Sequence, residues 1–164
     1  MPEIWDAYDR ELNKIDNVQL IRGEPIPDGF YHLVCDIVVK HTDGTYLLMQ
    51  RDFKKTFGGM WELTAGGSAL AGETPLEGAM RELREETGII SFNLKEIERF
   101  VNEKRHFVCA VHFCLTDCDK NSIILQKGET VAFRWLTRDE ILEMSDDALA
   151  PSKALEILKN TVLL

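Results

Sequence analysis

The sequence contains no segment that would carry it into or across a membrane. No apolar run approaches the roughly 18 residues of a transmembrane helix. The first residues also lack the basic stretch and the following apolar stretch of a secretory signal. These absences predict a cytoplasmic protein with no membrane partner.

Cysteine is scarce and shows no metal-binding pattern. The four cysteines are Cys35, Cys109, Cys114 and Cys118. None belongs to a CxxC pair, and no histidine stands at zinc-ligand spacing from them, so we expect reduced thiols. Cys109 and Cys114 are an odd number of residues apart, and on one regular strand they would face opposite sides of a sheet.

Basic residues are outnumbered by acidic ones. Lys and Arg total 19 against 28 Asp and Glu, which gives a formal net charge of −9. A general binder of nucleic-acid polymers, or a polybasic membrane binder, needs a face that neutralises phosphates, so we expect neither. A small phosphorylated substrate remains compatible with this charge, because bound divalent cations can reverse the local field.

A chain of 164 residues is long enough for one domain with a sizeable core. We divide it into an N-terminal arm, residues 1–30, and a main domain, residues 31–164. The arm begins with alternating aromatic and polar residues and ends in a turn cluster, which predicts a hairpin. Its Trp5 and Tyr8 form either a small satellite core or part of a subunit contact, and the second alternative would make the protein a homodimer.

The main domain alternates strand and helix patterns. Strands are predicted at residues 31–40, 45–51, 60–67, 92–104, 105–117 and 131–136, and a helix at residues 154–164. Thr137 and Glu140 form a capping box for a further short helix. Strands interleaved with helices predict an α/β protein with a mixed sheet packed between helices.

The most strongly punctuated helix is predicted at about residues 75–87. Thr74 is at its N-cap, Pro75 at its first position, Glu77 three residues after the cap, and Gly88 just past its last turn. One face of this helix is apolar and packs.

The adjoining arc of the same helix carries Glu82, Glu85 and Glu86. Three like charges within one turn repel one another, so they need either a solvated face or a bound cation. Glutamates on a helix are more often solvated surface. The helix alone leaves both interpretations open.

The surrounding residues favour the cation. The chain has Gly67, then Glu73 after five residues, then Arg81-Glu82-Leu83 after seven more, followed by Glu85-Glu86 and Gly88-Ile89, each after one. This stretch, residues 67–89, resembles the Nudix box at every specified position. The resemblance extends from about Tyr31 to the C-terminus and implies the Nudix fold, an α/β/α sandwich with a mixed sheet.

The resemblance also implies roles for the box residues. Glu82 and Glu86 match the principal metal ligands, Glu85 matches a further ligand or a water-orienting base, and the carbonyl of Gly66 matches a backbone ligand. Arg81 matches the residue that orients these carboxylates. Glu73 is assigned to holding the loop and Arg81 rather than to metal contact.

Outside the box, the general base varies among Nudix proteins. Glu129 is our candidate, and Glu103 is the second. Arg51, Lys54 and Lys55 form a small basic cluster, which is either solvated loop charge or a clamp on substrate phosphates.

The predicted ligands are all oxygen atoms, which favours Mg²⁺ or Mn²⁺ over zinc or copper. The reaction that the resemblance implies is metal-dependent hydrolysis of a diphosphate bond in a nucleoside diphosphate linked to another group, or in a related small molecule.

Two alternatives stay open. The flanks of the box look somewhat like those of isopentenyl-diphosphate isomerases. That family uses a cysteine after the strand before its box, and here no cysteine lies between Cys35 and Cys109. A non-catalytic module that senses nucleotides is the other alternative, although its usual mark, the loss of box glutamates, is absent.

Overall fold

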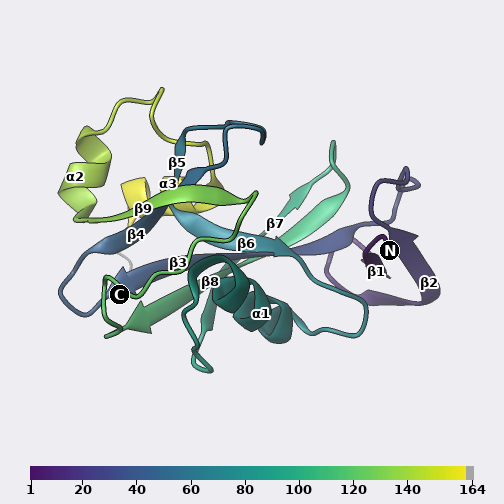
Figure 1. Ribbon diagram of the computed structural model, residues 1–164. Coiled ribbons are helices and arrows are strands. Elements are labelled where there is room, and N and C mark those ends of the chain that lie inside the picture. Colours follow the sequence, from purple (N-terminus) through teal and green to yellow (C-terminus); the bar gives the residue numbers. More distant parts are fainter. Residues whose placement is uncertain (162–164) are drawn as a thin grey trace.

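The structure is a computed structural model that describes residues 1–161 (Figure 1). The strands are β1 (Ile4–Tyr8), β2 (Lys14–Ile21), β3 (His32–His41), β4 (Tyr46–Arg51), β5 (Trp61–Glu62), β6 (Thr64–Ser68), β7 (Lys95–Asn102), β8 (Phe107–Thr116) and β9 (Thr130–Leu136). The helices are α1 (Pro75–Thr87), α2 (Arg138–Glu143) and α3 (Lys153–Asn160). No helix within this part of the chain is long and apolar enough to cross a membrane.

The main sheet is mixed. Its strand order is β5-β4-β3-β8-β7, with β6 also paired to β3 and β9 to β4. Strands β3 and β8 run parallel, and the other pairs are antiparallel. Strand β3 is at the centre, which explains its nearly continuous apolar sequence, since both of its faces are covered.

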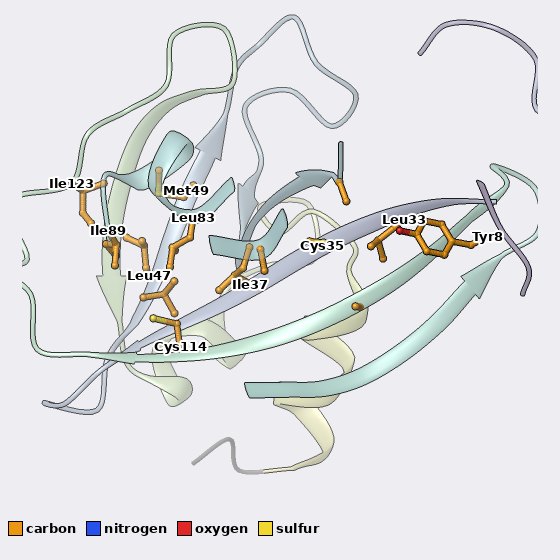
Figure 2. Packing of buried hydrophobic residues seen from close by; sticks show 14 residues of the cluster. Tyr8, Leu33, Cys35, Ile37, Leu47, Met49, Leu83, Ile89, Cys114 and Ile123 are labelled. Atoms are coloured by element: carbon orange, nitrogen blue, oxygen red, sulfur yellow. The ribbon is translucent and has the colours of Figure 1, made fainter. Parts of the chain in front are cut away.

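Helices cover the two faces of this sheet (Figure 1). On one face, Ala79 and Leu83 of α1 pack against alternate β3 residues, and Figure 2 shows this cluster running along the sheet, with Tyr8 beside Leu33. On the other face, α2 and α3 bury Ile141, Leu155 and Leu158. The predicted α/β/α sandwich with a mixed sheet is confirmed.

The cysteines follow the same division into faces. Cys109 belongs to the cluster under α3 and Cys114 to the cluster under α1, so they face opposite sides of β8 as predicted. None of the four cysteines is in a disulfide.

Helix α1 begins and ends at the predicted residues. The Thr74 hydroxyl accepts from the Glu77 N–H, the Glu77 carboxylate accepts from the Thr74 N–H, and Gly88 takes a left-handed conformation with φ of 78°. The capping box of Thr137 and Glu140 is likewise present on α2. The predicted C-terminal helix corresponds to α3, and residues 162–164 of that prediction lie outside the described residues.

One predicted strand was wrong. Residues 60–67 form two strands, β5 and β6, because they pair with different partners: β5 with β4, and β6 with β3. Strands β3 and β4 share only the pair Lys40 and Tyr46, so they diverge after their turn, and one straight strand could not pair with both. The two strands predicted after the box are also shorter, at Lys95–Asn102 and Phe107–Thr116.

The N-terminal arm is a hairpin, as predicted, and forms a separate two-stranded sheet of β1 and β2. Trp5 packs in a satellite cluster with Leu20 and stacks on His32 of β3, with ring centroids 4.1 Å apart. Tyr8 instead enters the main core, and its backbone exchanges two hydrogen bonds with Tyr31. The homodimer stays a prediction.

Candidate active site

The loop before α1 requires glycine because strand β6 is crowded on both sides. In the register of β3 and β6, Gly66 lies opposite Asp36. A Cβ atom on Gly66 would lie 2.1 Å from the Cys35 carbonyl oxygen, and one on Gly67 would lie within 2.8 Å of the Glu82 carboxylate. The two glycines therefore allow α1 and its glutamates to approach the sheet closely.

Arg81 lies at the centre of one group of carboxylates, which we call the Arg81 group: Arg81, Glu73, Glu82 and Glu85. Its guanidinium donates to both oxygens of Glu73 at 2.6 and 3.0 Å, to Glu82 at 2.8 Å and to Glu85 at 3.1 Å. It also donates to the carbonyl of Ser68. The Arg81 guanidinium thus offsets much of the predicted repulsion between the glutamates of this helix.

Glu73 is tied to the loop as well as to Arg81. Its Oε2 atom accepts a hydrogen bond from the Leu70 N–H at 2.8 Å. Although burial alone would raise it, the pKa of Glu73 is lowered by the hydrogen bonds from Arg81 and Leu70. Glu73 therefore lies as an ion in the position that the sequence predicted for a brace.

Glu86 is in a different environment. Its side chain is 6% exposed, and its Oε2 atom accepts from the Gly66 N–H at 3.0 Å. Burial raises its pKa to about 8, and the nearby charges of Glu62 and Glu82 add to this against the opposing hydrogen bond from Gly66. No arginine or lysine among residues 1–161 forms an ion pair with Glu86.

Two further carboxyl groups, Glu62 of β5 and Asp36 of β3, were missed by sequence reasoning, and Glu62 lies near enough to both Glu86 and Asp36 to raise their pKa values. Burial raises the pKa of Asp36 to about 7, helped by the charge of Glu62. Burial also raises the pKa of Glu62, opposed by Arg51. Asp36 had a usable signal, a lone acid inside a buried apolar strand, whereas Glu62 had none. We call Glu86, Glu62 and Asp36 the Glu86 group.

The predicted basic cluster divides in the structure. Arg51 pairs with Glu62 at 2.8 Å and donates to the Thr56 carbonyl at 2.7 Å. Lys55 pairs with Glu129 and lies near enough to Glu86 to oppose its raised pKa. Lys54 is exposed in the loop. The fold thus brings Arg51 and Lys55, but not Lys54, to the Glu86 group.

The two candidate bases lie in different places. Glu129 is about one-third exposed and meets Lys55 at the edge of the Glu86 group. Glu103 follows β7, accepts from the Tyr31 hydroxyl at 2.5 Å and pairs with Arg10 at 2.6 Å. Glu103 is therefore engaged with the N-terminal region, and Glu129 keeps the better position.

The donor set fits a hard divalent cation in chemistry. It consists of carboxylate and carbonyl oxygens, and Glu86 is buried without a cationic partner within the described part of the chain. The carboxylates are nevertheless not gathered into a ready cluster of three or more in residues 1–161, because Arg81 holds Glu82 and Glu85 while Glu86 turns to Gly66. Binding would require Glu82 or Glu85 to turn from Arg81 towards the ion.

Comparison with known proteins shows the family. The family model described as NUDIX domain matches residues 30–156. An uncharacterized Nudix hydrolase of Listeria monocytogenes is 31% identical over 140 residues, which cover 85% of this chain and 82% of the relative.

Solved structures share the fold. The crystal structure of DR0079 from Deinococcus radiodurans matches 96% of this chain and 98% of its own, with a TM-score of 0.75 at 19% identity. The NUDIX domain of Shewanella oneidensis NrtR, solved in complex with ADP ribose, matches 84% of this chain and 93% of its own, with a TM-score of 0.62 at 19% identity.

Proposed function

Because the chain belongs to the Nudix hydrolase family, as a pyrophosphohydrolase that cleaves diphosphate bonds, we propose that it acts with Mg²⁺ or Mn²⁺ on a nucleoside diphosphate-linked or related small molecule. The observation that carries the proposal is the difference between the Arg81 group and the Glu86 group. The Arg81 group is neutralised by an arginine, whereas Glu86 is buried near Glu62, and its hydrogen-bond partner within residues 1–161 is a backbone N–H. An acid in that environment is stabilised by a bound cation.

Glu82, Glu86, Glu85 and the Gly66 carbonyl would hold the cation. A bound divalent cation would offset the charge of the diphosphate and make a water molecule easier to deprotonate. Arg81 and Glu73 are positioning residues, because they fix the loop and the direction of the glutamates without facing the substrate.

Glu129 is the proposed general base. Its partial exposure lets a proton leave to solvent, and its pair with Lys55 keeps it at the edge of the Glu86 group. Arg51, Lys54 and Lys55 would contact substrate phosphates, Lys54 after movement of its exposed loop side chain. The NrtR domain binds ADP ribose, and this fold neighbour supports a nucleotide as the substrate class.

A phosphate-release assay coupled to a phosphatase tests the reaction, because cleavage of a linked diphosphate gives two phosphate monoesters that the phosphatase converts to free phosphate. We expect hydrolysis of at least one compound in a nucleoside-diphosphate panel with Mg²⁺ or Mn²⁺, and none with a chelator. Glu86→Gln should lower the rate by about 10³-fold or more, as expected when electrostatic stabilisation is removed. Its fold should persist, because the amide oxygen still accepts from the Gly66 N–H and no charge is buried.

Glu143→Gln is the matched control, since Glu143 is an exposed glutamate on α2. It should leave the rate unchanged. Full activity of folded Glu86→Gln, or hydrolysis that is indifferent to the chelator, would overturn the proposed mechanism.

A further inference from the structure

Lys55 and Glu129 form an ion pair at the edge of the Glu86 group. The proposed function gives each of them a task with the substrate, because Lys55 contacts a phosphate and Glu129 takes a proton from water. The ion pair prevents both tasks at once, since the Lys55 ammonium donates to the Glu129 carboxylate. The two side chains therefore have to separate before the reaction.

We propose that the phosphates of the substrate draw Lys55 away from Glu129, so that the general base becomes available only when a diphosphate is bound. The inference rests on the proposed function and adds a means by which the substrate controls the base of that site. In the free protein Lys55 covers Glu129, and in the complex Lys55 contacts the phosphates.

The ion pair is of a kind that a ligand can replace. The side chains of Lys55 and Glu129 are 31% and 33% exposed, and among residues 1–161 neither forms another ion pair. Water screens a pair with this exposure, so the pair contributes little to stability. Phosphate oxygens accept charge-assisted hydrogen bonds as a carboxylate does. Lys55 would thus exchange one acceptor for another at little cost.

The backbone around the two residues is held by contacts other than the ion pair. The Glu129 carbonyl accepts from the Asp52 N–H at 2.9 Å, and the Glu129 N–H donates to the Gln126 carbonyl at 3.1 Å. In the other loop, the Lys55 N–H donates to the Asp52 carbonyl at 3.0 Å, and the Lys55 carbonyl accepts from the Gly58 N–H at 2.9 Å. Separation therefore requires rotation of the Lys55 side chain, while the backbone of Glu129 keeps its position.

The charge of Lys55 already reaches the acids beside which the diphosphate would lie. Burial raises the pKa of Glu86 to about 8, and Lys55 is among the groups that oppose this rise. Burial also raises the pKa of Glu62, opposed by Arg51 and then by Lys55. Because a lysine side chain has a flexible stem, the ammonium can turn from Glu129 to a phosphate at this place.

Calorimetric binding of methylenediphosphonate to the full-length protein in Mg²⁺ tests the exchange. This diphosphate analogue has a carbon bridge that is not hydrolysed. Because Glu129 competes with the analogue for Lys55, Glu129→Gln should tighten binding about two- to fivefold, the range of an exposed ion pair. Lys55→Met should weaken binding about tenfold, as expected when a hydrogen bond to a charged group is lost. Both side chains are partly exposed, so the variants should fold, and urea unfolding checks this.

The double variant separates the exchange from simple repulsion between Glu129 and the analogue. In the Lys55→Met background Glu129 has no lysine to hold, so adding Glu129→Gln should change the affinity by less than about 1.5-fold. Repulsion alone would tighten binding equally in both backgrounds. Lys127→Met is the matched control, because Lys127 is exposed in the same connection before β9, and it should keep the wild-type affinity within about 1.5-fold.

The failures can be told apart. If the analogue binds with the expected dependence on both residues but no compound of the nucleoside-diphosphate panel is hydrolysed, the proposed function fails and the exchange of Lys55 stands. If Glu129→Gln tightens binding equally with and without Lys55, or leaves the affinity unchanged, the inference is overturned and the hydrolase is untouched. Wild-type protein that does not bind the analogue in Mg²⁺ also overturns the inference, because Lys55 then has no phosphate to contact.

Discussion

The box, residues 67–89, and the N-terminal hairpin hold the same loop in different ways. Within the box, Glu73 at the end of the loop is bound by Arg81, eight residues further along the chain. From the hairpin, the Asp6 carboxylate accepts from the Gly72 N–H at 2.7 Å and the Ile4 carbonyl accepts from the Ala71 N–H at 2.9 Å. One attachment is local in sequence, and the other joins residues 66 positions apart.

The two attachments also differ in the forces that maintain them. The box depends on charge, with one guanidinium among three carboxylates. The hairpin depends on packing and on one buried acid, since Trp5 stacks on His32, Tyr8 enters the core and Asp6 is 6% exposed. The loop of the box is therefore held by its own arginine and also by a segment far away in the sequence.

The largest effect is expected from removing the charge of the box. Arg81→Met leaves Glu73 and Glu82 partly buried without their cation, so the free energy of unfolding should fall by about 3–5 kcal/mol. Hydrolysis should fall at least 100-fold, because the glutamates lose their orientation. Urea unfolding and phosphate release measure the two effects. The exposed Arg84→Met on the same helix should change the unfolding free energy by less than about 0.5 kcal/mol, and equal losses in both variants would contradict the role given to Arg81.

A smaller effect is expected on the hairpin side. Asp6→Ala leaves the Gly72 N–H without its acceptor and should cost about 2 kcal/mol. Asp6→Asn keeps an acceptor and should recover about half of this, and hydrolysis should recover with it through kcat rather than KM. Lys14→Met removes an ion pair with Asp6 at 3.1 Å whose lysine is 51% exposed, so it should cost less than about 0.5 kcal/mol. A larger loss for Lys14→Met than for Asp6→Ala would show that the pair, and not the loop contact, matters.

The smallest effect concerns the pH dependence of the hairpin junction. Burial, followed by the charge of Arg22, lowers the pKa of His32 to about 4. The unfolded chain, with an ordinary histidine pKa near 6.5, takes up the proton first as the pH falls. The free energy of unfolding therefore has its full value, as far as His32 is concerned, above about pH 6.5. It decreases as the pH falls towards 4, because the unfolded chain binds a proton that the folded protein excludes.

His32→Phe should keep the stacking on Trp5 but remove this pH dependence. Urea unfolding of both proteins at steps between pH 7.5 and 5.5 should give a difference that changes by about 1–2 kcal/mol over that window. A constant difference would show that His32 is not protected from protonation by the hairpin.

Several features of the site could be predicted from sequence because they depend on neighbours along the chain. The ends of α1 follow from Thr74, Glu77 and Gly88, whose hydrogen bonds span three or four residues. The pairing of Arg81 with Glu73 followed from the resemblance to the Nudix box, and the structure places the two side chains in contact.

Other features could not be predicted because they depend on segments far apart. Glu62 comes near both Glu86 and Asp36 only through the register of β3 with β6 and of β4 with β5. The separation of β5 from β6 at Leu63 depends on the divergence of β3 from β4. The position of Glu103 beside Tyr31 depends on the junction with the hairpin.

The local sequence is enough to place α1, to identify its acidic residues, and to show the spacing of a Nudix box. Which acids are neutralised and which are buried depends on the folded arrangement of the whole chain. Helix caps and side-chain spacing are interactions between near neighbours, so they are written in the local sequence. The raised pKa values of Glu86 and Asp36 come from burial, and burial depends on which distant strands and helices exclude water from the same place.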